Sequence, residues 1–505
     1  MSRRKPAGRR TSPAGQSGAI YPLSLCMIVR DEERFLRDAL TSVEGVVDEI
    51  CIVDTGSTDG TVALAESFGS KLEVVTWRDD FAWARNQALA LATGAWIFVL
   101  DADERLAPES RELLRALRGV KPDGRGRWIR CRNYNDAELK TVASTNAIVR
   151  IFPNDPAIRY RGTLHEYIAR TSVDGPLPAE RTPIEIVHHG YTHNVMSSRL
   201  KAERNLRVSR AAFEAAPGDP VLVYNYAMSA LLAGENEIAR EQLERVISLT
   251  AGTPRGFRPM ALSKLAGLYV DAARPADALR VADECIAIVG SYPDGHFARG
   301  RALIGLGRYD EARASFEESI RAGSSTAFEH FVVDDEIATW KAHNEIGGTF
   351  VIERRFAEAR QRLELALKVR PKERTLLLNV ARCCEAQGDL SAALANFRAV
   401  LETFQDEPGA IEYVNYVFRH ESADGVLAAV ETALPVLGDD YRRAFLTSAA
   451  AAMLRVQRRA EAAGLLRQVL AVGDESAGRA VIQALAQHYK QPELNDVLAG
   501  AENAH

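Results

Sequence analysis

The sequence has few cysteines and no long uninterrupted apolar stretch. Its 505 residues include six cysteines, scattered without Cys-x-x-Cys spacing. This scatter disfavours a disulfide framework or a zinc site, and we expect reduced, partly buried thiols in a cytoplasmic protein. No window is apolar over about 18 consecutive residues, so the sequence predicts no membrane span.

An excess of charge of one sign is also absent. Lysine and arginine number 63 against 68 aspartates and glutamates, which gives a formal net charge of −5. Such mild acidity gives no reason to expect nucleic-acid binding. Neither a Gly-x-Gly-x-x-Gly motif nor a P-loop follows any expected strand. Their absence argues against a dinucleotide-binding enzyme and a P-loop NTPase.

The N-terminal residues 1–19 are basic and rich in Pro, Gly and Ser. They lack the apolar core of a signal peptide, so we expect a disordered tail. A tail that touches anionic lipid or RNA is the alternative to a solvated one.

Strand and helix patterns alternate from residue 21 to about residue 108. We expect strands at residues 23–29, 49–53, 72–75 and 96–100, and helices at about 35–43, 61–68 and 82–92. Short strands separated by helical patterns are typical of a doubly wound, Rossmann-like parallel sheet. Three further strands, at 127–132, 147–152 and 184–188, predict an antiparallel-edged second half beside it.

A helical repeat begins after residue 197. Each unit has a turn followed by an alanine that opens the next helix; Ala278 and Ala312 are 34 residues apart, as are Ala359 and Ala393. A 34-residue helix-turn-helix period indicates tetratricopeptide repeats, and residues 302–316 resemble that family's consensus. We expect a first domain at 20–196, a linking helix at 197–218, an all-α solenoid at 219–490 and a tail at 491–505.

Two carboxylates follow the apolar strand at 96–100. Asp101 and Asp103 are spaced i, i+2, so they share one side of an extended chain, beyond the strand's carboxyl end. Open α/β sheets bind ligands in this crevice. Hard oxygen ligands there suit Mg²⁺ or Mn²⁺ carrying a diphosphate. Because Asp-x-Asp triplets are common, an acidic turn before a helix is the alternative.

Polar residues also follow the second strand and open the third helix. Asp54 ends a buried strand, where its carboxylate can accept a hydrogen bond from a base N–H or a ribose hydroxyl. Asp59 or Thr58 is the expected N-cap of the next helix. Arg85 lies early in an apolar helix, where guanidinium and helix dipole together favour a phosphate. A solvated helix face is the alternative for this arginine.

These motifs together resemble the family-2 glycosyltransferases of GT-A fold over residues 23–191. The specific elements are Val29-Arg-Asp-Glu-Glu33, Val53-Asp-Thr-Gly-Ser-Thr-Asp-Gly60, Ala84-Arg-Asn86 and Leu100-Asp-Ala-Asp-Glu-Arg-Leu106. Residues 150–166 and 188–191 resemble the subgroup of lipooligosaccharide-core glucosyltransferases and peptide S-glycosyltransferases, some of which carry C-terminal tetratricopeptide repeats.

The resemblance implies inverting transfer of a hexose from a nucleotide-diphosphate sugar, most often a UDP sugar. Asp54 would hold the uracil or ribose, Arg85 would lie near the nucleotide or diphosphate, and Asp101 would bind the ribose side. Asp103 would ligate Mn²⁺ or Mg²⁺, which stabilises the leaving diphosphate as a Lewis acid.

The first motif, which contributes Arg30 and Glu32 to the nucleotide-sugar site, departs from the family pattern. Arg30 stands where a lysine is usual, and Asp31 stands where an asparagine is usual. The second change bears on base specificity, if the usual side-chain amide contacts the nucleotide.

An inverting displacement needs a base on the face opposite the leaving group. Glu166 is the leading candidate and His165 the second, because an imidazole also serves as a base near neutral pH. Asp136 is a third candidate. His188 ends a strand and is expected to complete the metal shell or touch the diphosphate, with a structural histidine as the alternative.

Two other functions remain open. In one, the first domain is vestigial and the repeats form a scaffold. In the other, the protein is a nucleotidyltransferase, which needs a basic phosphate loop where residues 27–33 are acidic.

In a glycosyltransferase, the repeats would dimerise the enzyme or present an acceptor protein or peptide. The acceptor stays open between glycolipid or other glycan, peptide thiol, protein hydroxyl and small metabolite.

Overall fold

A computed structural model describes residues 19–134, 142–164, 166–173, 175–188, 195–252, 256–323 and 334–497. The expected tails lie mostly outside these ranges. The chain divides into two compact units, residues 1–308 with 318–338, and residues 309–317 with 339–505. This division falls inside the expected solenoid, so the first unit holds both the sheet domain and the first repeats.

Within the described residues, one sheet of eight strands has the order β3-β2-β1-β4-β7-β6-β10-β5. The strands are β1 (Leu23–Val29), β2 (Glu49–Asp54), β3 (Lys71–Val74), β4 (Trp96–Val99), β5 (Glu104–Leu106), β6 (Gly126–Tyr134), β7 (Val142–Pro153) and β10 (Ala179–His188). The first four pair in parallel, and β7 pairs antiparallel with both β4 and β6. The predicted fold class, a mostly parallel α/β sheet followed by helices, is confirmed.

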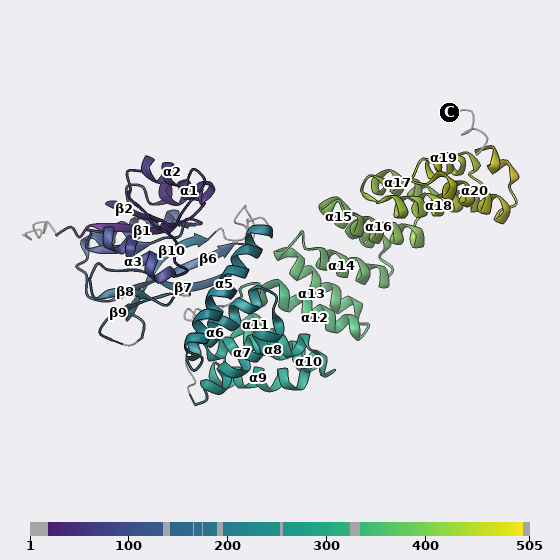
Figure 1. Cartoon of the computed structure of the whole chain (residues 1–505). Helices are drawn as coiled ribbons and strands as arrows, with labels where there is room; N and C mark the ends of the chain where they lie inside the picture. Colours follow the sequence, from purple (N-terminus) through teal and green to yellow (C-terminus); the bar gives the residue numbers. More distant parts are fainter. Residues whose placement is uncertain are drawn as a thin grey trace, which may run out of the picture. The chain divides into compact units, whose positions relative to one another are not determined.

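Helices cover both faces of the parallel half (Figure 1). Alternate residues of β1 point to opposite sides: Leu25 packs in the core under α1 (Glu33–Val43) and α2 (Thr61–Ser67), whereas Cys26 packs in the core under α3 (Phe81–Leu91). Because both faces are buried, the strand is apolar at nearly every position, as parallel strands usually are. All six cysteines are free and buried.

A second, two-stranded sheet packs against α3 and was not predicted. It consists of β8 (Ile158–Arg161) and β9 (Tyr167–Arg170). The side chain of Asn86 on α3 joins it to the helix: Nδ2 donates to the Tyr160 carbonyl at 3.0 Å, and Oδ1 accepts from the Tyr160 N–H at 2.9 Å. Asn86 therefore binds backbone in this structure.

The helical part begins with α5 (Val195–Ala215). In the first unit it continues through α6 (Pro220–Leu232), α7 (Asn236–Leu249), α8 (Arg258–Asp271), α9 (Pro275–Ile288) and α10 (Pro293–Gly305). α11 (Tyr309–Gly323) contributes residues to both units. The second unit holds α12 (Ala342–Ile352), α13 (Phe356–Val369), α14 (Arg374–Ala386), α15 (Leu390–Phe404), α16 (Glu407–His420), α17 (Ala423–Ala433), α18 (Asp439–Arg455), α19 (Arg459–Leu470) and α20 (Glu475–His488).

Most turns between the paired helices of a repeat contain a left-handed residue. Gly307 and Gly388 take φ values of 72° and 78°, and Ala273 and Arg354 occupy the same turn position at 54° and 61°. Glycine adopts this conformation without steric cost, whereas a side chain costs about 1 kcal/mol. Five residues after each of these left-handed positions comes the recurring alanine, such as Ala312, which is fully buried where paired helices pack.

No helix in the described ranges is long and apolar enough to cross a bilayer.

Candidate functional site

The turn after β2 is organised by Asp54. This carboxylate is fully buried, and its Oδ1 accepts the backbone N–H groups of Gly56 and Ser57 at 2.9 and 2.8 Å. Its Oδ2 accepts the Ser57 hydroxyl at 2.5 Å. Gly56 has a φ of 107°, which favours glycine. Asp54 thus holds the turn at the carboxyl edge of the sheet in the shape that its motif encodes.

Acidic residues of the motif at 29–33 accept hydrogen bonds from the loop of the motif at 53–60. Asp31, itself at a left-handed φ of 52°, accepts from the Thr58 N–H at 2.7 Å, and Glu33 accepts from the Gly60 N–H at 3.0 Å. Asp59 accepts from the Thr61 N–H at 3.0 Å, but the N-cap residue of α2 is Gly60. The N-cap therefore lies one residue later than expected, and Asp59, just before it, accepts a hydrogen bond from the first backbone N–H of the helix.

Glu32 lies half-buried beside the carboxylates that follow β4. Burial raises the pKa of its carboxyl from 4.5 to about 7, and repulsion from Asp103 and Asp101 adds to the effect. Lys201, on α5, opposes it. Arg30, the other expected contributor from this motif, is exposed, and its Nε lies 3.9 Å from an Asp31 carboxylate oxygen. Several negative charges therefore converge at one edge of the sheet.

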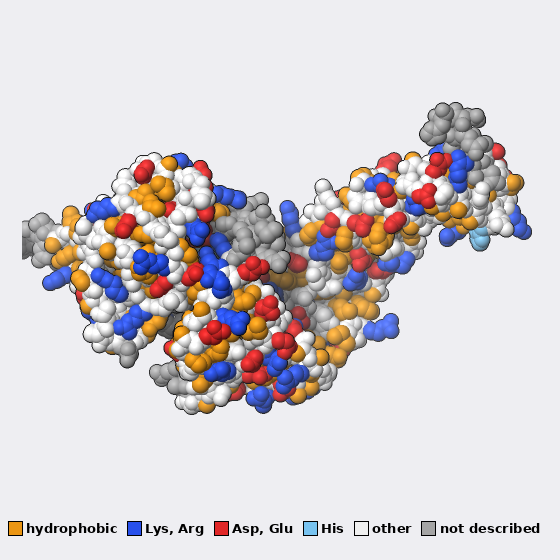
Figure 2. Space-filling model, in the orientation of Figure 1, with side chains coloured by type: hydrophobic (Ala, Val, Ile, Leu, Met, Phe, Trp, Pro, Cys, Tyr) orange, Lys and Arg blue, Asp and Glu red, His pale blue; other side chains and the backbone are white. Residues whose placement is uncertain are grey.

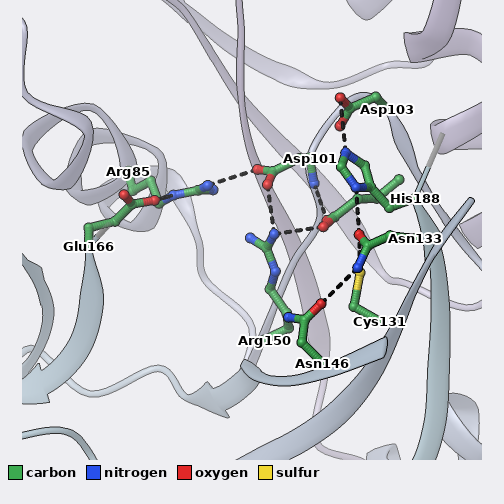
Figure 3. Close-up of polar contacts among 10 residues, drawn as sticks. Arg85, Asp101, Asp103, Cys131, Asn133, Asn146, Arg150, Glu166 and His188 are labelled. Carbon is green, nitrogen blue, oxygen red and sulfur yellow. Dashed lines mark hydrogen bonds and ion pairs between the residues drawn. The ribbon is translucent and has the colours of Figure 1, made fainter. Parts of the chain in front are cut away.

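Arg85 is buried and connects two carboxylates (Figure 3). Its Nη2 donates to Asp101 Oδ1 at 2.8 Å and its Nε donates to Glu166 Oε1 at 2.5 Å. Nη1 is buried and has no hydrogen-bond partner among the described residues. A solvated helix face is excluded for this arginine, whose side chain is 9% exposed.

Asp101 is held by a second arginine that sequence reasoning missed. Arg150 on β7 donates Nη2 to Asp101 Oδ2 at 2.6 Å and to Glu104 Oε1 at 2.8 Å. Glu104 also accepts the Asp101 N–H at 2.9 Å. Burial alone would raise the pKa of Asp101, but Arg150 and Arg85 hold it well below its usual range. Both oxygens of Asp101 are therefore committed to guanidinium groups.

Asp103 faces a different partner, because β4 ends at Val99 and the two aspartates lie in the turn beyond it. Asp103 Oδ2 is 3.3 Å from His188 Nε2, and His188 Nδ1 is 2.8 Å from Asn133 Oδ1. Asn133 in turn donates Nδ2 to Asn146 Oδ1 at 3.0 Å (Figure 3). Burial opposes protonation of His188, but the hydrogen bond to Asp103 prevails and raises its pKa.

The donor set of Asp103 and His188 suits a divalent metal. Among the described residues, no three His, Cys, Asp or Glu side chains form a ligand cluster. Two protein donors would remain for the ion, and Mg²⁺ or Mn²⁺ commonly completes its shell with phosphate oxygens and water. The Asn133 contact holds Nδ1, which leaves Nε2 directed at Asp103, as a metal-ligating histidine requires.

A cavity of about 420 Å³ adjoins this network. Its polar wall consists of Arg85, Asp101, Arg150 and Glu166. Aromatic and aliphatic side chains form most of the rest, among them Phe81, Trp128, Tyr160 and Leu164, and Asn205 of α5 also contributes. The cavity can therefore take a group with an apolar body and a polar end.

Two of the expected site residues lie outside the described residues. These are His165 and Asp136. Of the remaining candidates, the structure joins Arg85, Asp101 and Glu166 directly and pairs Asp103 with His188. Glu104 immediately follows the Asp-x-Asp triplet, and Arg150 begins the segment 150–166 that resembles the glycosyltransferase subgroup. Both residues therefore lie in or next to patterns from which the site was predicted.

Comparison with known protein families gives two kinds of match along the chain. Residues 24–141 match the family model of glycosyl transferase family 2. Residues 293–322 and 353–408 match tetratricopeptide repeat models.

Curated relatives extend this likeness. A TPR repeat-containing protein of Synechococcus elongatus is 34% identical over 311 residues, which cover 58% of this chain and 75% of the relative. The prophage-derived glycosyltransferase SunS of Bacillus subtilis is 24% identical over 46% of this chain and 56% of its own length. The lipopolysaccharide core biosynthesis glycosyltransferase LpsC of Rhizobium meliloti is 42% identical over 98 residues, 18% of this chain and 36% of the relative.

Proposed function

The chain belongs to the family of proteins that join a glycosyl transferase family 2 domain to tetratricopeptide repeats, and we propose that it is an inverting hexosyltransferase that uses a UDP sugar. The family model and the glycosyltransferases among its relatives support glycosyl transfer in general. The proposal adds the donor, the stereochemistry, the metal and the residues that act.

One observation carries the proposal: a chain of ion pairs runs from Glu166 through Arg85 to Asp101, next to the pair of Asp103 and His188 (Figure 3). Inversion requires the base and the leaving group on opposite faces of the sugar. Glu166 lines the cavity, and Asp103 and His188 lie at the other end of the network (Figure 3). A hexose in the cavity, with its diphosphate toward Asp103 and His188, would meet this requirement.

Glu166 is the proposed general base. One carboxylate oxygen accepts from Arg85, and the other takes no hydrogen bond from any residue that the structure describes. That oxygen is available to an acceptor hydroxyl or thiol in the cavity. Arg85 fixes the orientation of the carboxylate, so that little reorganisation is needed when the proton moves.

Asp103 and His188 are the proposed metal ligands. A bound Mn²⁺ or Mg²⁺ would supply Lewis-acid stabilisation of the leaving diphosphate. We assign Arg30, Glu32, Asp54 and Asp101 to the nucleotide-sugar side. Asp54 would act there by shaping its turn, and Asp101 by holding Arg85 and Arg150 in place.

The experiment compares UDP release from a panel of UDP sugars, with Mn²⁺ and with EDTA, in the wild type and in Asp103→Asn. We expect metal-dependent release in the wild type and its loss in the variant. Asp123→Asn is the matched control, because Asp123 pairs with Arg127 in the same domain and lies outside the site. Unchanged release in Asp103→Asn would overturn the assignment.

The repeats are proposed to bind the acceptor protein or peptide, or to join two copies of the chain. The alternative for the whole protein is a repeat scaffold with a vestigial transferase domain. It predicts no metal-dependent UDP binding, which calorimetry on the full chain measures directly.

A further inference from the structure

Helix α5, which follows the sheet domain, is held against it by two contacts. Arg207 donates Nη1 and Nη2 to the Asp79 carboxylate oxygens at 2.8 and 2.9 Å. The guanidinium of Arg204 lies over the ring of Phe81, 5.2 Å from its centre. Phe81 begins α3, the helix that carries Arg85, so these contacts place α5 beside the site.

Lys201 and Arg204 lie on one face of α5, because residues three apart on a helix are neighbours. Val208, a further turn along that face, is buried. Lys201 is exposed and forms no hydrogen bond or ion pair with the described residues. Asn205, four residues further along α5, lines the cavity together with Arg85 and Asp101. Because residues four apart on a helix are neighbours, Lys201 lies one helical turn from a residue of the site.

Within the described part of the chain, Arg204 has no carboxylate in hydrogen-bond contact either. Its Nε and Nη2 both donate to the Asn205 amide oxygen, at 3.2 and 3.0 Å. Burial lowers the pKa of its guanidinium, and repulsion from Arg30 at the end of β1 lowers it further. Figure 2 shows Lys and Arg side chains gathered in the region of α5. Arginines that repel one another beside a cleft are expected where an anion binds.

We propose that Lys201 and Arg204 of α5, together with Arg30, bind the diphosphate of the nucleotide sugar. The inference rests on the proposed function. A diphosphate suits both kinds of group at this edge of the sheet. Its oxygens complete the coordination shell of a metal on Asp103, and they accept charge-assisted hydrogen bonds from the lysine and arginine side chains. The linking helix would then complete the donor site in addition to joining the two parts of the chain.

The test is calorimetry of UDP with Mn²⁺ on the full chain, in the wild type, Lys201→Ala, Arg204→Ala and the double variant. Each lost charge-assisted contact should weaken UDP binding by about ten-fold or more. Lys201→Arg should restore affinity, and UMP, which has one phosphate, should lose less than UDP. Arg210→Ala is the matched control, because Arg210 lies on the same helix and pairs with Glu214 at 2.9 Å.

The outcomes separate this inference from the proposed function. If the wild type binds none of UDP, GDP, CDP and ADP, the proposed function fails. If the wild type binds UDP and the double variant binds it equally well, only the role of α5 is overturned. Lys201 is exposed and unpaired among the described residues, so its substitution keeps the test valid even if loss of Arg204 loosens the helix.

Discussion

Arg85 and Asp101 form an ion pair of 2.8 Å between α3 and the turn that follows β4. The same guanidinium binds Glu166, and the same carboxylate binds Arg150. The first acid of the Asp-x-Asp triplet therefore anchors a network, while the second faces His188. A short motif that reads as a pair of equivalent acids contains two residues with different partners.

Replacing Arg85 should destabilise the sheet domain strongly. Arg85→Met leaves the Glu166 and Asp101 carboxylates without their shared guanidinium, and breaking a buried pair typically costs about 3–5 kcal/mol. We expect the free energy of unfolding in urea to fall by about that amount. Asp101→Asn in the same chain should recover part of the loss.

Arg115→Met is the control for this prediction. Arg115 pairs with Glu112 on the surface, where an ion pair contributes about 0–1 kcal/mol. Equal losses for the buried and the exposed arginine would show that the network does not stabilise the fold.

Replacing Glu166 should affect turnover and leave donor binding intact. Glu166→Gln keeps an oxygen that accepts from Arg85 but removes the base, and a positioned base contributes about 100-fold or more. We expect kcat for UDP release in the presence of acceptor to fall by that factor, with an unchanged KM for the UDP sugar. Glu180→Gln, at an exposed pair with Arg125, should behave as wild type. A normal kcat in Glu166→Gln would transfer the role to His165 or Asp136.

Variants of Asp54 should separate its contribution to the stability of the fold from its contribution to nucleotide binding. Asp54→Ala leaves the N–H groups of Gly56 and Ser57 without their acceptor, and we expect a loss of about 2–3 kcal/mol in the free energy of unfolding. Asp54→Asn retains Oδ1 as an acceptor and should be more stable than the alanine variant. Calorimetry of UDP binding then decides the second role: wild-type affinity in Asp54→Asn would limit this carboxyl group to shaping the turn.

The parallel half of the sheet was predictable because burial on both faces leaves a strong local pattern. The strand at residues 96–100, for example, is apolar throughout and ends beside two acids, and β4 lies at Trp96–Val99. Asp54 and Asp103 were likewise selected as candidates from their place after a strand. The repeats were found from the spacing of alanines that pack between helices, such as Ala278.

The partners of these residues were not predictable, because long-range pairing sets them. Arg150 reaches Asp101 only since β7 pairs antiparallel with β4, in a register that places Ile151 opposite Phe98. No local pattern near Arg150 specifies that register. The position of α5 beside the site was not predictable for the same reason. It depends on the ion pair of Arg207 with Asp79, which lies 128 residues earlier in the chain.

A buried acid in the first repeats should make stability depend on pH. Asp294, at the start of α10, is 4% exposed, and its Oδ2 has no hydrogen-bond partner in the described part of the chain. Burial raises its pKa from 3.8 to about 7; repulsion from Asp334 adds to this, and Lys264 opposes it. The folded state therefore holds the proton more tightly than the unfolded state.

The sign of the effect follows from that difference. The stability due to protonated Asp294 is fully present below about pH 4 and is lost as the pH rises through about 7. A shift from 3.8 to about 7 corresponds to at most about 4 kcal/mol. Asp294→Asn removes this loss, so in urea at pH 8 the variant should be more stable than the wild type, and at pH 4 the two should be similar. Because Glu32 also has a raised pKa, the wild-type minus variant difference is the quantity to measure. Asp283→Asn, on α9 at an exposed pair with Arg299, should leave the pH profile unchanged. A difference for Asp294→Asn that stayed constant from pH 4 to pH 8 would contradict the prediction.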